Sequence, residues 1–261
     1  MTRIVADLGN SRLKWGRVGP DGRLGATLAL PLDDPSAWAS AWDDWGLSGA
    51  EVSWAISSVN PPLAGRFGRF LDDKGVDQVR WYRSVADVPV RHDLVLTDTG
   101  GADRALGVVA ALARHRGRGP GLVVSCGTAV VVERISAEGV WQGGAIAPGL
   151  GPMGKALHLL TAQLPEVVPR DVPAPFGRST VPSLEAGIFW GVVGTIRELV
   201  TRQAEGLSSA PWLVWTGGDA PTFARWVEWP GAEVVPHLVL EGLCQEGLRT
   251  QDSGLRGETS P

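Results

Sequence analysis

The chain reads Ile4-Val5-Ala6-Asp7-Leu8-Gly9-Asn10-Ser11-Arg12-Leu13-Lys14-Trp15 near its amino terminus. Three apolar residues come before a polar turn and an alternating run follows it, a pattern that predicts a β-hairpin. Glycine and small polar residues in the turn let backbone N–H groups come close to an anion. The stretch therefore predicts a hairpin whose turn can hold a phosphate, and a buried turn without a ligand is the alternative.

A second stretch repeats this design in the middle of the chain. It reads Leu122-Val123-Val124-Ser125-Cys126-Gly127-Thr128-Ala129-Val130-Val131-Val132. Superposing Gly9 on Gly127 aligns apolar strand, small-residue turn and apolar strand, so the chain resembles two halves of one design. We expect an N-terminal domain over 1–116, a C-terminal domain over 117–250 and a frayed tail over 251–261. The basic, glycine-rich stretch 114–120 is the expected linker.

Composition limits the classes of function that are open to the chain. Its 261 residues are 44% hydrophobic and 20% charged, with a net charge of −4, which is ordinary for a globular protein. No overall positive field attracts nucleic acid or anionic lipid, so we expect small-molecule or protein partners. No apolar run is long enough for a membrane span or a secretory signal, and a cytoplasmic location is expected. Two cysteines and four scattered histidines give neither a disulfide framework nor zinc-ligand spacing.

The remaining segments alternate between strand and helix patterns. Strands are expected over 51–59, 79–81 and 212–215, and helices over 61–74, 101–114, 157–163, 183–205, 222–227 and from 238 onward. Strands followed by helices in both halves predict an α/β architecture.

One glycine-rich motif resembles two nucleotide-binding patterns without meeting the requirements of either. Residues 149–156 match both a dinucleotide-binding and a Walker-type pattern. Ala156 stands where a Walker loop needs Ser or Thr, and Pro148 and Pro152 interrupt a dinucleotide loop. We therefore interpret the motif as a structural turn.

Three carboxylates accompany small-residue turns: Asp7, Asp103 and Asp219. Phosphoryl transfer needs mainly positioning, charge neutralisation and one base for the acceptor hydroxyl, which such residues can supply. The alternative for Asp103 and Arg104 is an acidic residue at a helix start beside a surface arginine.

The ordered set of motifs resembles the type III pantothenate kinase family. It consists of Asp7-Leu8-Gly9-Asn10-Ser11, Ser57-Ser58-Val59, Gly101-Ala102-Asp103-Arg104, Gly127-Thr128-Ala129, Gly143-Gly144-Ala145-Ile146-Ala147-Pro148-Gly149, Thr180, Thr216-Gly217-Gly218 and Leu240-Glu241-Gly242-Leu243. The resemblance spans residues 4 to about 246. It implies the acetate and sugar kinase/Hsp70/actin superfamily: an α/β fold of two ribonuclease-H-like domains with an ATP cleft between them.

The resemblance also implies roles for individual residues. Asp7, Leu8, Gly9, Asn10, Ser11, Arg12, Leu13 and Lys14 form the first ATP phosphate loop, with Asp7 near Mg²⁺. Thr128 contacts ATP from the second loop, and Gly217 and Gly218 lie near the adenosine. Pantothenate is held by Gly101, Ala102, Asp103, Arg104 and Thr180, with Asp103 as base and Arg104 on the carboxylate. A homodimer with the acceptor site at the subunit interface is implied, as is phosphorylation of pantothenate, the first step of coenzyme A biosynthesis.

Two positions depart from the family pattern. Ser125 replaces an aspartate that binds the activating monovalent cation, K⁺ or NH₄⁺, and Leu94 replaces a tyrosine that contacts pantothenate. Loss of an anionic ligand predicts a weaker cation site. Two alternatives stay open: a catalytically impaired paralogue acting as a nucleotide-binding regulatory (transcriptional accessory) factor, and a kinase for another small hydroxy acid. Retention of Asp7, Asp103, Arg104 and Thr128 favours the enzyme.

Overall fold

The structure is a computed structural model that describes residues 1–245, and these residues form two compact units. Unit 1 comprises Met1–Val90, Val95–Arg114 and the segment from Leu238 onward, and unit 2 comprises Arg91–Leu94 and His115–His237. Each unit contains one five-stranded sheet with helices against it. Each is described by itself below.

The sheet of unit 1 has the order β3-β2-β1-β4-β5. Its strands are β1 (Thr2–Leu8), β2 (Leu13–Val18), β3 (Leu24–Leu30), β4 (Val52–Ser58) and β5 (Gln78–Tyr82). β1 pairs antiparallel with β2, which confirms the first predicted hairpin, and parallel with β4.

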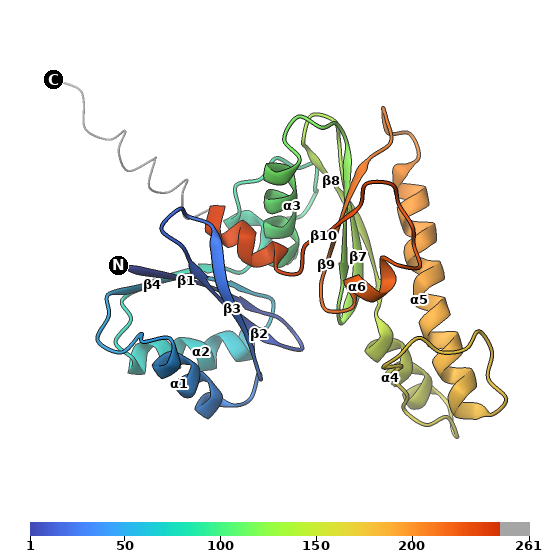
Figure 1. Ribbon diagram of the computed structural model, residues 1–261, viewed down its shortest axis with the longest axis horizontal. Helices are drawn as coiled ribbons and strands as arrows, with labels where there is room; N and C mark the ends of the chain where they lie inside the picture. Colours follow the sequence, from blue (N-terminus) through green and yellow to red (C-terminus); the bar gives the residue numbers. More distant parts are fainter. Residues whose placement is uncertain (246–261) are drawn as a thin grey trace. The chain divides into compact units, whose positions relative to one another are not determined.

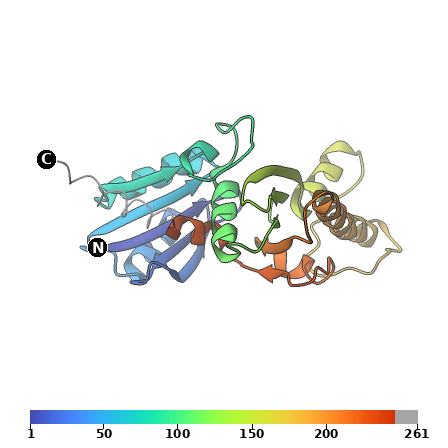
Figure 2. The same cartoon turned by 90° about the horizontal axis from the view of Figure 1, so that it is seen from above.

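Helices cover both faces of this sheet (Figures 1 and 2). α1 (Pro35–Asp44) and α2 (Pro61–Asp73) lie on one face over a core rich in aromatic rings, in which Trp15, Trp54 and Phe67 contact one another. The opposite face carries the helical segment 238–245, whose Leu240 side chain approaches Gly16 of β2. α3 (Ala102–Arg114) packs against that segment, because a Cβ on Gly242 would lie 2.3 Å from the Leu106 carbonyl oxygen. This close approach explains why 238–245 groups with unit 1, whereas the sequence suggests the C-terminal domain.

The sheet of unit 2 repeats the topology of the first. Its order is β10-β9-β6-β7-β8, formed by β6 (Gly121–Cys126), β7 (Ala129–Ile135), β8 (Trp141–Pro148), β9 (Trp212–Thr216) and β10 (Glu233–Val234). As in unit 1, a central strand pairs antiparallel with the next strand and parallel with the strand that follows a helix. The repeat inferred from Gly9 and Gly127 is therefore a repeat of topology.

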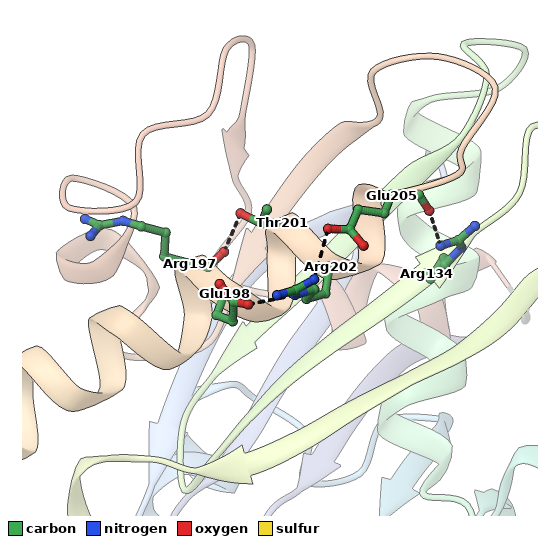
Figure 3. A network of polar contacts seen from close by, with 6 residues as sticks. All are labelled: Arg134, Arg197, Glu198, Thr201, Arg202 and Glu205. Carbon is green, nitrogen blue, oxygen red and sulfur yellow. Dashed lines mark hydrogen bonds and ion pairs between the residues drawn. The ribbon is translucent and has the colours of Figure 1, made fainter.

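One face of the unit 2 sheet is buried by α5 (Thr180–Ala204) and the short α6 (Ala220–Phe223). α5 ends where Arg134 of β7 donates hydrogen bonds to the carbonyl oxygens of Gln203 and Glu205, each at 2.9 Å. Figure 3 shows the contact with Glu205. The guanidinium satisfies carbonyl groups that the helix end leaves unpaired. Glu198 and Arg202 form an ion pair at 2.7 Å on the outer face of the same helix.

Two expectations for helices in unit 2 were wrong in their bounds. The glycine-rich motif 149–156 is the start of α4 (Leu150–Leu160), not a turn, and α4 replaces the helix expected over 157–163. Pro152 is tolerated because it lies in the first turn, where its missing N–H has no helical acceptor. α6 begins at Ala220 rather than 222, since Pro221 favours a helix start.

Among residues 1–245, no helix is long and apolar enough to cross a membrane. The expected tail over 251–261 lies outside the described residues.

Candidate active site

A row of polar residues crosses the unit 1 sheet at the carboxyl ends of β1 and β4. Asp7 is opposite Lys14 in the β1–β2 ladder and opposite Ser57 in the β1–β4 ladder, and Ser57 is opposite Tyr82 of β5. Side chains alternate along a strand, and the neighbours of these residues belong to the core beneath α1 and α2. The row therefore lies on the other face, where the segment 238–245 packs.

Asp7 is the electrostatic centre of this row. Burial among protein atoms, together with the nearby charge of Asp103, raises the pKa of Asp7 from its ordinary value of 3.8 to about 7, although Lys14 acts in the opposite direction. Asp103 reaches this position from α3, far along the chain. Two carboxyl groups that raise each other's cost of ionisation form a typical site for a cation or a shared proton.

Asp103 is fixed at the first turn of α3. Its Oδ1 accepts a hydrogen bond from the Arg104 N–H at 2.9 Å, and a Cβ on Gly101 would lie 2.4 Å from that same oxygen. A side chain at position 101 would displace the folded-back carboxylate. The same absent Cβ would lie 3.0 Å from Val59, just beyond β4, so the start of α3 adjoins the end of β4.

The loop before α3 is held by backbone contacts. Val85 of the 3-10 turn η1 (Val85–Asp87) donates its N–H to the Gly100 carbonyl at 2.9 Å, and Ser84 forms a bridge with Gly101. These contacts hold Gly101–Arg104 in one conformation beside the row.

The first hairpin turn is open to solvent. Gly9 donates its N–H to the Arg12 carbonyl at 3.2 Å, and Asn10, Ser11 and Arg12 are exposed. The turn begins directly after Asp7-Leu8, so its backbone lies at the same end of the sheet as the carboxylate pair.

Three loops meet at the corresponding end of the unit 2 sheet. The Gly149 N–H donates to the Thr128 carbonyl at 3.0 Å, and the Asp219 N–H donates to the Cys126 carbonyl at 3.2 Å. Gly217 has φ +96°, and a Cβ there would lie 2.1 Å from the Cys126 carbonyl oxygen. The loops that carry Thr128, Gly217 and Gly149 thus meet at this end of the sheet, although the sequence predicts only a structural turn for the motif that begins at Gly149.

β6 ends at these loops and carries Ser125, the position at which the family pattern has a cation-binding aspartate. Ser125 is opposite Thr216 in the β6–β9 ladder. Both side chains end in neutral hydroxyl groups. The next residue, Cys126, is buried, and burial raises the pKa of its thiol well above the ordinary range, so it is no nucleophile. Burial also raises the pKa of Asp219.

Two expected substrate residues lie elsewhere in unit 2. Leu94 follows a segment that is hydrogen-bonded to Trp141 at the edge of β8, and its side chain lies 3.4 Å from the Cβ position of Gly143. Thr180 is the first residue of α5 and is exposed.

Sequence reasoning gives no site role to Ser57 or Tyr82 of the row, although Ser57 belongs to one of the motifs of the resemblance. The sequence places both near the end of a strand, and the strand register is needed to bring them to the row that contains Asp7. The described residues contain no group of three or more His, Cys, Asp or Glu side chains that could hold a metal alone. The Asp7–Asp103 pair suits a hard divalent cation that keeps most of its water or phosphate ligands.

Comparison with known proteins finds related sequences over most of the chain. Residues 3–202 match the family model described as type III pantothenate kinase. A type III pantothenate kinase from Chromobacterium violaceum is 35% identical over 246 residues, which cover 93% of this chain and 98% of that protein.

Solved structures share the fold at low sequence identity. A 2-dehydro-3-deoxygalactonokinase from Sinorhizobium meliloti aligns with a TM-score of 0.59 and 15% identity, over 95% of this chain and 99% of that one. A Baf family transcriptional activator from Campylobacter jejuni aligns with a TM-score of 0.57 and 18% identity, over 96% and 99%. With the repeated sheet topology, these matches confirm a two-domain α/β fold of the actin-like type.

Proposed function

The chain belongs to the type III pantothenate kinase family and phosphorylates pantothenate with ATP, the first step of coenzyme A biosynthesis, and we propose that the Asp7–Asp103 pair carries the reaction. The supporting observation is that two carboxylates from distant segments lie close enough for Asp103 to raise the pKa of Asp7. Both belong to motifs that resemble those of the family.

Asp103 acts as the general base in this proposal. Its carboxylate accepts the proton of the primary hydroxyl of pantothenate as that oxygen forms a bond to the γ-phosphorus and the bond to the β–γ bridging oxygen of ATP breaks, releasing ADP. Arg104, the next residue, pairs with the carboxylate of pantothenate. Gly101 leaves the space in which the Asp103 side chain folds back over the start of α3.

Asp7 holds the divalent cation. When bound, Mg²⁺ neutralises charge on the phosphate oxygens. Ionisation of Asp7 is costly without a cation, because burial and Asp103 both oppose it, so a cation held by Asp7 fits the site and leaves Asp103 to act as the base. Lys14, opposite Asp7 in the ladder, adds a positive charge for the phosphate chain.

The small-residue turns hold ATP. The first turn is exposed at Asn10, Ser11 and Arg12, and phosphate oxygens approach its backbone there. In unit 2 Thr128 contacts ATP, while Gly217 and Gly218 lie along the adenosine. The left-handed backbone of Gly217 gives this loop its sharp turn.

Activation by K⁺ or NH₄⁺ is weak in this protein. Ser125 and its ladder neighbour Thr216 offer only neutral oxygens where the family pattern has a carboxylate. Leu94 likewise offers no hydrogen bond to pantothenate.

The protein acts as a homodimer, and its exposed apolar surface supports this. The second half of α4 exposes Leu159 (66%) and Leu160 (84%), and Phe176, which precedes α5, is also exposed (67%). Exposed clusters of large apolar side chains usually mark an interface. We assign the protein to the cytoplasm, with pantothenate and ATP as its partners and without nucleic acid or membrane.

A coupled assay of ADP release tests the function. Purified protein should release ADP when pantothenate is added to Mg²⁺ and ATP, with little change between K⁺ and Na⁺ buffers. A protein that binds ATP but releases no ADP under any monovalent salt would instead be a nucleotide-binding regulator. Release with other hydroxy acids but not with pantothenate would indicate a different acceptor.

A further inference from the structure

Ser57 has a buried hydroxyl group for which the described part of the chain provides no hydrogen-bond partner. Its side chain is 0% exposed, and within residues 1–245 no group forms a hydrogen bond with Oγ. An unsatisfied buried polar group costs free energy that alanine would avoid. This unsatisfied hydroxyl lies on the strand next to Asp7, directly opposite it in the ladder.

The position of Ser57 is defined by three elements. It is opposite Asp7 on the parallel neighbouring strand, and alternation along β4 directs it to the same face of the sheet. Gly101 and Val59 bring the start of α3, with Asp103, to the end of the same strand. The hydroxyl thus belongs to the surroundings of the Asp7–Asp103 pair.

We propose that Ser57 is a positioning residue for the divalent cation, whose hydroxyl forms a hydrogen bond with a water molecule bound to the cation at Asp7. Asp7 would occupy only one or two of the roughly six positions around Mg²⁺, so most of the remaining ligands would be water or phosphate oxygens. A bound water needs partners outside the first shell, and the free hydroxyl of Ser57 supplies one. The inference rests on the proposed binding of the cation at Asp7.

Its neighbour Ser58 provides a matched control. Ser58 points to the opposite face of β4, where Oγ donates to the Asn60 carbonyl and accepts from the Asn60 N–H, each at 3.2 Å. Replacing Ser58 removes hydrogen bonds that help to start α2, whereas replacing Ser57 removes none that the structure contains.

The test measures binding of Mn²⁺, as a probe for Mg²⁺, to the full-length protein in the presence of saturating ADP, by electron paramagnetic resonance of free Mn²⁺. Ser57→Ala should weaken Mn²⁺ binding roughly 10-fold, with unchanged ADP affinity in EDTA and an unchanged or higher melting temperature. Ser57→Cys, nearly equal in size but a poor hydrogen-bonding group, should behave alike. Ser58→Ala should bind Mn²⁺ normally and melt at a lower temperature.

Wild-type Mn²⁺ affinity in Ser57→Ala or Ser57→Cys would overturn the proposal. So would a fall in melting temperature of Ser57→Ala as large as that of Ser58→Ala, because it would reveal a structural role. Neither measurement uses pantothenate or turnover, so the inference can fail while the kinase activity stands. Absence of ADP release with normal Mn²⁺ effects would count against the proposed function alone.

Discussion

Asp7 at the end of β1 and Asp103 in the first turn of α3 lie close enough for one carboxylate to raise the pKa of the other. The chain passes through four further strands and two helices between these residues. Bringing two like charges together lowers the stability of the fold, and such an arrangement is characteristic of a functional site.

The raised pKa of Asp7 predicts a pH-dependent effect of Asp7→Asn. The folded-state pKa, about 7, lies above the ordinary 3.8, so the neutral form favours folding. This contribution is full below pH 4 and is lost as the pH rises through 7. In metal-free buffer, Asp7→Asn should therefore gain stability relative to wild type between pH 5 and pH 8, by roughly 1–3 kcal/mol. Urea denaturation at both pH values measures it.

The exposed Asp21→Asn serves as the control for that experiment, because Asp21 lies in a surface turn away from the site. A difference between Asp7→Asn and wild type that is constant across this pH range would show that Asp7 titrates normally.

Gly217 and Gly218 should differ sharply in their tolerance of alanine. A Cβ on Gly217 would collide with the Cys126 carbonyl at 2.1 Å and would occupy a left-handed backbone, whereas a Cβ on Gly218 would meet nothing within 4 Å. Gly217→Ala should lower the free energy of unfolding by about 2 kcal/mol or more, and Gly218→Ala by less than about 0.5 kcal/mol. Equal stabilities of the two variants would contradict the loop conformation.

The substitution at Ser125 predicts an unusual response to salt. Wild-type turnover should change less than about threefold when K⁺ replaces Na⁺, and Ser125→Asp should increase the dependence, since a carboxylate binds a hard cation more strongly than a hydroxyl group. Initial rates at constant ionic strength measure this. A steep K⁺ requirement in the unaltered protein would show that other oxygens complete the site.

Much of the fold could be predicted because local patterns carry it. Both hairpins follow from apolar strands around a glycine turn. Their similarity predicts two halves of one design, and the two sheets share one topology. The start of α4 was missed because Pro152 reads as a breaker, although the first turn of a helix accepts proline. The packing of 238–245 in unit 1 depends on the contact between Gly242 and Leu106, which local sequence does not encode.

The site was predictable to a smaller extent. Family motifs point to Asp7, Asp103 and the glycine loops residue by residue. Ser57 could not be singled out as a site residue, because its place beside Asp7 depends on the register of two parallel strands that are joined through two other strands and a helix. The contact of Gly149 with Thr128 likewise depends on strand register, here the pairing of β7 with β8.

The most direct test of the central claim is the turnover of Asp103→Asn with pantothenate. Asparagine keeps the size of the side chain but removes its basicity, so ADP release should fall by roughly 10²- to 10⁴-fold while ATP affinity changes little. Asp98→Asn, which alters an exposed acid in the preceding loop, should retain wild-type turnover. Near-normal turnover of Asp103→Asn, with only a stability loss of about 0.3–1 kcal/mol, would mean that Asp103 is a helix-end acid and not the base.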